Sequence, residues 1–242
     1  MSPMIQIQGV EKLYRMRGED VHALRGVDLS VQQGEYISIM GPSGSGKTTL
    51  FNMIGGLDRP TAGSITVSGI RLAELDSRSL AWFRCCHIGY VFQTFNLIDT
   101  LTALDNVKLP CVFRMLSDSE AETRAKEMLH LVGLRDRMGH RPQELSGGQM
   151  QRVAIARSLV NDPEIVLADE PTGNLDLKTG ESIIELLGRL NAERGVTVVT
   201  VTHDHKMLKA SDRVVWFESG RIEKIQRGEE LDVHLGHIQP SE

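Results

Sequence analysis

Residues 41–49 of this 242-residue chain read Gly41-Pro42-Ser43-Gly44-Ser45-Gly46-Lys47-Thr48-Thr49, and this stretch decides the fold class. It fits the phosphate-binding pattern G-x-x-x-x-G-K-[ST], the P-loop. An apolar run over residues 36–40 predicts a strand before it, and residues 49–57 predict the start of a helix after it. Glycines let backbone amides surround phosphate oxygens, and the helix N-terminus adds its positive dipole end. A glycine-rich turn without a ligand is the alternative, and the flanking elements argue against it.

Side chains of the same segment complete a predicted nucleotide site. We expect Lys47 to place its positive charge on the β- and γ-phosphates, and the hydroxyl of Thr48 to bind Mg²⁺. The residues predicted to contact the nucleotide here are Gly41, Pro42, Ser43, Gly44, Ser45, Gly46, Lys47, Thr48 and Thr49.

Two adjacent carboxylates, Asp169 and Glu170, follow the apolar run of residues 165–168. Ligands of open α/β sheets gather at the carboxyl ends of strands, and consecutive strand residues point to opposite sides. We therefore expect Asp169 to hold Mg²⁺ through water and Glu170 to act as the base that polarises the attacking water. Such a pair, taken alone, is more often a solvated strand end. The P-loop in the same chain favours the catalytic interpretation.

The chain has a net charge of -5, a sequence pI of about 5.9 and 40% hydrophobic residues. This composition is typical of a soluble globular protein and gives no support for a general nucleic-acid binder, which would carry a basic surface. No apolar run approaches the roughly 18 residues that cross a bilayer, and the first residues lack a secretory signal. We therefore expect a cytosolic chain that needs a membrane-spanning partner for any membrane role. Cys85, Cys86 and Cys111 are expected to stay reduced.

Short apolar runs alternate with helical stretches, which predicts an α/β fold with a mostly parallel sheet. A region of few strand signals, approximately residues 94–160, predicts a helical lobe inserted into one domain that spans residues 1–242. Within it, Ser117 and Glu120 have the form of a capping box, and Gly133 supplies a helix stop. Residues 228–242 form a polar tail. The candidate strands are residues 5–10, 27–31, 36–40, 64–67, 88–92, 165–168, 196–201 and 214–218.

A second glycine-rich motif, Leu145-Ser146-Gly147-Gly148-Gln149, precedes the acidic strand. Ser146 is predicted to cap a helix that begins at Gly147 or Gly148, and the two glycines keep its N-terminus open to a phosphate. With the P-loop and the acidic strand in this order, the chain resembles the nucleotide-binding subunit of ATP-binding cassette (ABC) transporters. The resemblance implies a P-loop ATPase with an added antiparallel β region, with ATP and Mg²⁺ bound.

The same resemblance implies a homodimer, because in the family the signature motif of one protomer closes over ATP on the P-loop of the other. Ser146, Gly147, Gly148 and Gln149 would then contact ATP across the dimer seam. Each ATP would join the two protomers, and hydrolysis would loosen them.

Further positions match the family one by one. Gln93 resembles the glutamine that touches Mg²⁺ or the attacking water, and His203 resembles the histidine that contacts the γ-phosphate. Asp176 ends the segment that resembles the D-loop of the dimer seam, and we expect it to contact ATP. Tyr14 resembles the aromatic residue that stacks on adenine, with an ordinary packing role as the alternative.

Three longer stretches, residues 89–97, 101–107 and 168–176, are similar to the lipoprotein-releasing and macrolide-export group of the family. This implies a peripheral ATPase on the cytoplasmic face of the inner or plasma membrane that drives export, lipoprotein extraction or force transmission through a separate permease subunit. The permease would dock in the stretch from Phe95 to Pro110, near Phe113 and Met115; internal packing of the lobe is the alternative for this apolar stretch. A regulatory ATPase of the cell-division type, which transports nothing, is the alternative function.

Overall fold

Strand β3 (Tyr36–Met40) lies inside a six-stranded sheet and is buried along its whole length. The computed structural model describes residues 2–16 and 18–228. The sheet order is β10-β9-β3-β8-β7-β6, and every pairing is parallel except that between β9 and β10. The other strands are β6 (Ile88–Val91), β7 (Ile165–Asp169), β8 (Thr197–Thr202), β9 (Arg213–Glu218) and β10 (Arg221–Arg227). Continuous apolar runs suit these strands because both faces of the sheet are covered.

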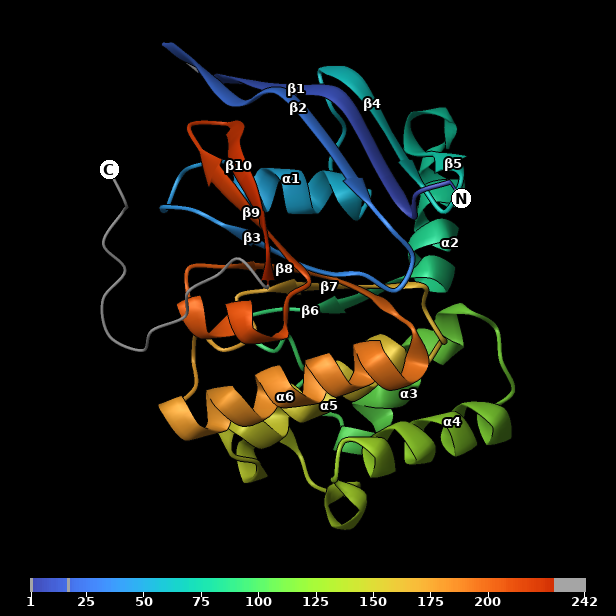
Figure 1. Cartoon of the computed structure of the whole chain (residues 1–242). Helices are drawn as coiled ribbons and strands as arrows, with labels where there is room; N and C mark the ends of the chain where they lie inside the picture. Colours follow the sequence, from blue (N-terminus) through green and yellow to red (C-terminus); the bar gives the residue numbers. More distant parts are fainter. Residues whose placement is uncertain (1, 17, 229–242) are drawn as a thin grey trace.

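A second sheet is antiparallel and has the order β2-β1-β4-β5. Its strands are β1 (Ile5–Met16), β2 (Glu19–Val31), β4 (Ala62–Val67) and β5 (Ile70–Arg71). Helix α1 (Lys47–Ile54) runs between the two sheets, and its apolar residues share one buried cluster with both of them (Figure 1). The P-loop that begins this helix is therefore anchored on two sides.

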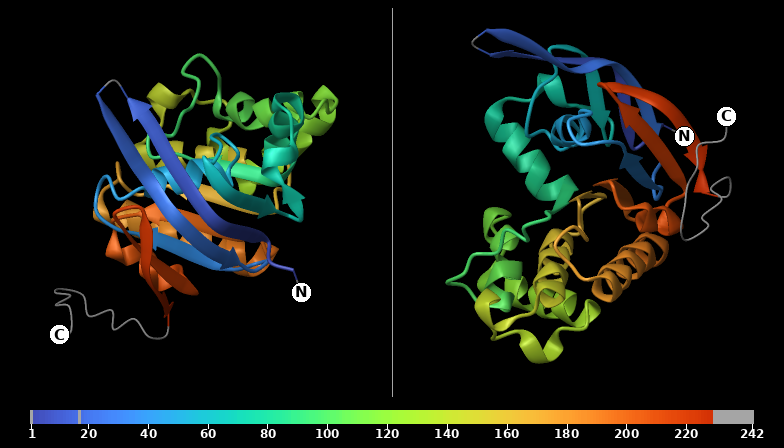
Figure 2. Two further views of the ribbon diagram at one scale, coloured as in Figure 1. Left: turned by 90° about the horizontal axis from the view of Figure 1, so that it is seen from above. Right: turned by 90° about the vertical axis from the view of Figure 1, so that its left-hand side faces the viewer.

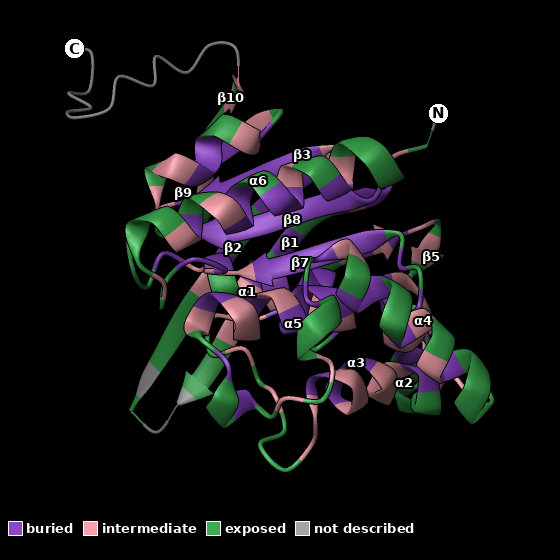
Figure 3. Cartoon of the chain, turned by 90° about the horizontal axis from the view of Figure 1, so that it is seen from below, coloured by how far each residue is buried: buried purple, intermediate pink, exposed green. Residues whose placement is uncertain are grey.

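Helices cover the other face of the parallel sheet and share a second buried cluster with it. The segment between β6 and β7 is helical and extends away from the antiparallel sheet (Figure 2). Burial follows the layers: β3, β7 and β8 are covered, whereas the outer face of α6 is open (Figure 3). The helices are α2 (Ser77–His87), α3 (Ala103–Phe113), α4 (Asp118–Leu131), α5 (Gly147–Leu159) and α6 (Leu177–Arg194), with 3-10 turns η1 (Leu72–Glu74), η2 (Arg135–Arg137), η3 (Pro142–Glu144) and η4 (His205–Ala210).

The α/β class with a mostly parallel sheet and an antiparallel β region is confirmed, and details differ. Strand β10 was missing from the predicted strands because a bulge between Ile222 and Lys224 breaks the alternation of two residues that marks a strand. Ser117 does cap α4. The capping box is incomplete, because the Glu120 carboxylate accepts a hydrogen bond from Arg124 in place of the Ser117 amide.

Three other expectations concern membrane spans, the tail and the thiols. Within the described residues, no helix is both long enough and apolar enough to span a bilayer. Residues 229–242 of the predicted tail lie outside the described part of the chain. Cys85, Cys86 and Cys111 are free thiols, as expected.

Candidate active site

The P-loop lies at the carboxyl end of β3 and turns directly into α1. Gly46 precedes the helix with φ 105°, and a Cβ there would lie 2.4 Å from the carbonyl oxygen of Ala23, so no other residue fits. The ammonium of Lys47 folds back over the loop and donates to the carbonyl oxygens of Gly41 and Pro42, both at 2.8 Å. The sequence therefore builds a loop whose cation faces its own glycine-rich backbone.

Lys47 and the two acidic residues share one electrostatic environment. The Lys47 side chain is mostly buried, which lowers its pKa, while the charges of Glu170 and Asp169 act to raise it. Burial and the neighbouring Glu170 raise the pKa of Asp169, and Lys47 opposes that rise. The P-loop lysine and the carboxylates that end β7 thus lie close enough to influence each other.

Glu170 stands in an unusual backbone conformation beside His203. Its φ is 44°, in the left-handed region that residues other than glycine seldom adopt, and its amide donates to the carbonyl of Val201 at 2.8 Å. Oε1 of Glu170 lies 2.9 Å from Nδ1 of His203. Backbone strain of this kind clusters at functional sites. Here it directs the Glu170 carboxylate toward the end of the neighbouring strand β8.

The segment after β6 meets the segment after β7. The amide of the Asn174 side chain donates to the backbone carbonyl of Gln93 at 2.9 Å. A Cβ on Gly173 would lie 2.7 Å from Nε2 of Gln93, so the glycine permits this close approach. Gln93 is consequently held against the loop that carries Glu170.

The signature motif begins helix α5 with a reciprocal cap between Ser146 and Gln149. Oγ of Ser146 accepts from the amide of Gln149, and Oε1 of Gln149 accepts from the amide of Ser146 at 2.9 Å, which completes a capping box. Gly147 lies against Leu175 of the same chain. In the described part of the chain, no hydrogen bond or ion pair joins residues 145–149 to the P-loop.

Asp176 and Tyr14 have local partners in the structure. The carboxylate of Asp176 caps α6 by accepting from the amide of Thr179, and hydrogen bonds from the side chain and the amide of Thr179 hold its pKa below the usual range. The hydroxyl of Tyr14 donates to Oδ2 of Asp58 at 2.7 Å, and the residue as a whole is 36% exposed.

Arg157 was not among the predicted residues. It projects from α5, and its guanidinium donates to the backbone carbonyls of Phe95, at 2.8 Å, and Asn96. Both Phe95 and Asn96 have positive φ. Because Phe95 lies close behind Gln93, one side chain joins the signature helix to the Gln93 loop. No sequence motif marks this contact.

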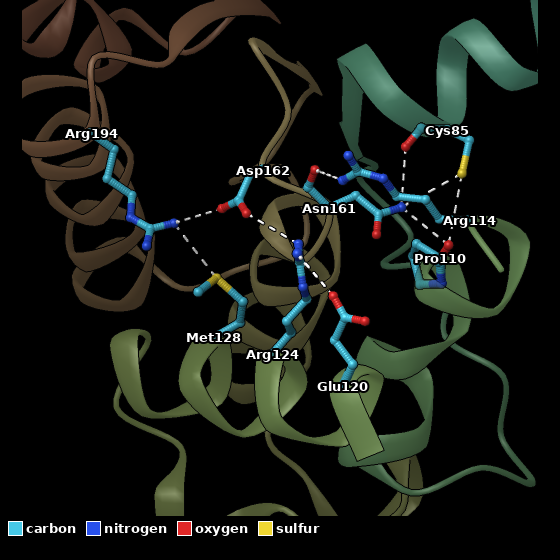
Figure 4. Close-up of polar contacts among 9 residues, drawn as sticks. All are labelled: Cys85, Pro110, Arg114, Glu120, Arg124, Met128, Asn161, Asp162 and Arg194. Atoms are coloured by element: carbon cyan, nitrogen blue, oxygen red, sulfur yellow. Dashed lines mark hydrogen bonds and ion pairs between the residues drawn. The ribbon is translucent and has the colours of Figure 1, made fainter. Parts of the chain in front are cut away.

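The end of α5 is a junction between the helical segment and α2. The side-chain amide of Asn161 donates to the carbonyl oxygens of Cys85 and Pro110, both at 3.1 Å, and Arg114 donates to the Asn161 carbonyl at 2.6 Å. The neighbouring carboxylate of Asp162 pairs with arginines of α4 and α6. Figure 4 shows this junction, whose remaining members are Glu120, Arg124, Met128 and Arg194.

A cavity of about 1030 Å³ adjoins this junction. Residues in and near the predicted docking stretch differ in their exposure to solvent. Phe113 and Met115 are 65% and 85% exposed, whereas the apolar residues of α3 that face the lobe are buried. The lining comes from α2, the Gln93 loop and α3, and includes Trp82, Asn96, Leu109, Pro110, Phe113 and Met115.

The sequence matches the family model described as ABC transporter over residues 24–173. An uncharacterized ABC transporter ATP-binding protein of Thermotoga maritima is 51% identical over 94% of this chain and 97% of its own length. The macrolide export ATP-binding/permease protein MacB of Rhodopirellula baltica is 48% identical over 90% of this chain, which spans 32% of that protein. A solved structure with TM-score 0.86 and 46% identity covers 94% of this chain and 100% of its own: a dimeric post-hydrolysis state of the ATP-binding cassette MJ0796, bound to ADP and Pi. MJ0796 comes from Methanocaldococcus jannaschii.

Proposed function

This chain belongs to the ABC transporter family as an ATP-hydrolysing subunit, and from that premise we propose that two copies close around two ATP molecules to drive a separate membrane protein. One observation carries the proposal. Lys47, Asp169 and Glu170 influence one another beside His203, while the signature motif contacts its own D-loop segment through Leu175. The P-loop of one copy therefore has no signature motif of its own chain beside it, and a second copy can supply that motif.

The hydrolytic step follows from the position of Glu170. Its carboxylate takes a proton from a water molecule, whose oxygen bonds to the γ-phosphorus. The bond from that phosphorus to the β–γ bridging oxygen breaks, so ADP and phosphate leave. His203 holds the Glu170 carboxylate from the side of β8 and has its exposed ring available for the γ-phosphate. Lys47 neutralises negative charge on the phosphates, and Gln93 orients the attacking water.

The residues predicted to bind the metal have a donor set that suits magnesium. Thr48, Asp169 and Gln93 offer a hydroxyl, a carboxylate and an amide oxygen, and Mg²⁺ prefers oxygen ligands from few protein groups, with phosphates and water filling its other positions. Within the described residues no cluster of three acidic, histidine or cysteine side chains forms a dedicated metal cage. When bound, Mg²⁺ supplies charge neutralisation at the transferring phosphoryl group.

The dimer would bring Ser146, Gly147, Gly148 and Gln149 onto the partner's ATP, with Asp176 and its loop at the seam. The capped N-terminus of α5 offers amides and a positive dipole end to the γ-phosphate. Tyr14 would stack on adenine at the other end of the nucleotide. Loss of the γ-phosphate removes this bridge, so hydrolysis releases the two copies from each other.

The membrane partner would dock on the cavity between α2 and α3. Exposed Phe113, Met115 and Trp82 surround it, and apolar surface rimmed by polar groups marks an interaction site. The MacB relative is named as an ATP-binding and permease protein, and this chain matches 32% of its length. We infer that this chain works with a separate permease, as a peripheral ATPase on the cytoplasmic face of the membrane that drives export, extraction or force transmission.

The decisive experiment measures ATP-dependent dimerisation of Glu170→Gln, which keeps the size of the side chain but removes the base. We expect a monomer without nucleotide and a stable dimer with saturating ATP and Mg²⁺, measured by light scattering after gel filtration. The double variant Glu170→Gln with Ser146→Arg, which blocks the signature, should remain monomeric. A monomeric Glu170→Gln protein in saturating ATP would show that the proposed assembly is wrong.

A further inference from the structure

Tyr14 is held by two charged side chains. Its hydroxyl donates to Oδ2 of Asp58 at 2.7 Å, and the ammonium of Lys12 lies 4.8 Å from the centre of its ring. The same ammonium donates to Oδ1 of Asp58 at 2.7 Å. Asp58 thus bonds to both of the other side chains, and the Thr49 side chain of α1 also contacts the Tyr14 hydroxyl.

This set joins the antiparallel sheet to the helix of the P-loop. Asp58 lies just beyond α1, which starts at Lys47, whereas Lys12 and Tyr14 belong to β1. Further hydrogen bonds fasten the turn that carries Asp58 to the same strand. Lys12 donates to the Arg59 carbonyl at 2.8 Å, and Thr61 accepts from the Leu13 amide at 3.0 Å. The Tyr14 ring is therefore fixed relative to the loop that holds the phosphates.

The charges suit such an arrangement. Burial alone would raise the pKa of Asp58, but hydrogen bonds from Lys12, Tyr14 and the Arg59 amide hold that pKa below its usual range. Burial and the bond to Asp58 raise the pKa of Tyr14, so its phenol keeps the proton that it donates. Lys12 is only 12% exposed in its side chain.

The Lys12 ammonium also lies over one face of the Tyr14 ring. A cation over an aromatic face is attracted by the ring quadrupole and covers that face. An adenine base can then stack only on the opposite face. Resting on the adenine contact proposed above for Tyr14, we propose that Asp58 and Lys12 are positioning residues that fix the ring of Tyr14 for one-sided stacking of the base.

The experiment compares binding of ADP with binding of inorganic pyrophosphate, measured by calorimetry. The two ligands share the phosphate site, but only ADP carries the base. Tyr14→Phe breaks the Tyr14–Asp58 bond while the ring remains, and Asp58→Asn keeps an acceptor oxygen but removes the charge that holds Lys12 and strengthens the bond to Tyr14. Tyr14→Ala removes the ring itself, and Glu127→Gln changes an exposed carboxylate of α4 as the matched control.

We expect Asp58→Asn and Tyr14→Phe to weaken ADP binding by about threefold to tenfold, which is the cost of ordering one side chain on binding. Pyrophosphate affinity should stay unchanged, and the KM for ATP should rise with kcat retained. The double variant Asp58→Asn with Tyr14→Phe should weaken ADP binding by less than the product of the two single effects, because both changes act on the Tyr14–Asp58 contact. Glu127→Gln should bind both ligands like the native chain.

Three other results would overturn the inference, each in a different way. If Tyr14→Ala weakens ADP binding but Asp58→Asn and Tyr14→Phe do not, adenine stacks on Tyr14 without help from Asp58. If pyrophosphate affinity falls in parallel with ADP affinity, the network supports the phosphate loop and not the base. If Tyr14→Ala binds ADP normally, the stacking contact is wrong, and the ATPase assignment stands because it depends on Lys47 and Glu170.

Discussion

Nδ1 of His203 lies 2.9 Å from Oε1 of Glu170, although the two residues follow different strands of the parallel sheet. The contact exists because β7 and β8 are neighbours and their carboxyl ends share one edge. It gives Glu170, the proposed general base, a partner from outside its own loop. The orientation of the Glu170 carboxylate therefore depends on His203, which takes no part in bond making or breaking in the proposed reaction.

This contact predicts the effect of His203→Ala. Loss of the imidazole frees the Glu170 carboxylate and removes the proposed contact to the γ-phosphate, so kcat should fall by about 10²-fold or more. ADP affinity should remain native because the P-loop is untouched. Steady-state hydrolysis and ADP calorimetry check the two statements. His130→Ala, at an exposed position of α4, serves as the control, and a native kcat in His203→Ala would contradict the assignment.

Lys47→Ala should abolish most nucleotide affinity. The buried ammonium is the cation of the phosphate loop, and charge-assisted hydrogen bonds to phosphate are strong. We expect ADP affinity to drop by about tenfold or more, or roughly 1.4 kcal/mol per decade. Calorimetry with ADP measures this directly. Lys126→Ala removes a surface lysine that pairs with Glu122 and should leave the affinity native.

Gly46→Ala tests the geometry of the loop. A Cβ at this position would meet the Ala23 carbonyl oxygen, and φ 105° is unfavourable for alanine. We expect a loss of about 1–3 kcal/mol in the free energy of unfolding together with weak ADP binding. Urea denaturation gives the first quantity. Gly139→Ala is the comparison, because no atom lies within 4 Å of a Cβ there, and it should fold and bind normally.

Arg157→Ala should uncouple the signature helix from the Gln93 loop. It removes the donor of the Phe95 and Asn96 carbonyls, at a cost of about 0.5–1.5 kcal/mol in the free energy of unfolding, because the Asn96 carbonyl is exposed to water. Hydrogen exchange of the amides around Gln93 should accelerate. Arg189→Ala, on the exposed face of α6, is the control. Unchanged exchange in Arg157→Ala would show that other contacts hold the loop.

The pH dependence of stability should reveal the ionised Asp58. Its pKa is held below the ordinary value, so its contribution is fully present above the unfolded-state pKa of about 3.9 and is lost as pH falls through the lower folded-state value. Asp58→Asn should therefore lower the Tm at pH 7, and the difference from the native chain should shrink in acid. A difference that is constant with pH would mean that the Asp58 charge contributes nothing.

The sequence predicted the candidate site where reactive or phosphate-binding residues directly follow an apolar strand. Gly46, Lys47 and Glu170 belong to contiguous motifs beside apolar runs, and parallel strands bring such ends to one edge. The contacts of Arg157 and Asp58 join residues far apart in the chain, and no spacing rule predicts them. Glu120 shows the opposite error: its local pattern fits a capping box, yet an arginine one turn later competes for the carboxylate.

The signature motif rests on Leu175 of its own chain and has no bond to its own P-loop within the described residues, and this separation has a genetic consequence. Suppose that one allele encodes Lys47→Ala and another Ser146→Arg. In a dimer with one copy of each variant, one ATP site combines the altered P-loop with the altered signature motif. The other ATP site combines the native P-loop with the native signature motif. Two inactive alleles should then complement each other when expressed together, and an allele that carries both changes should rescue neither.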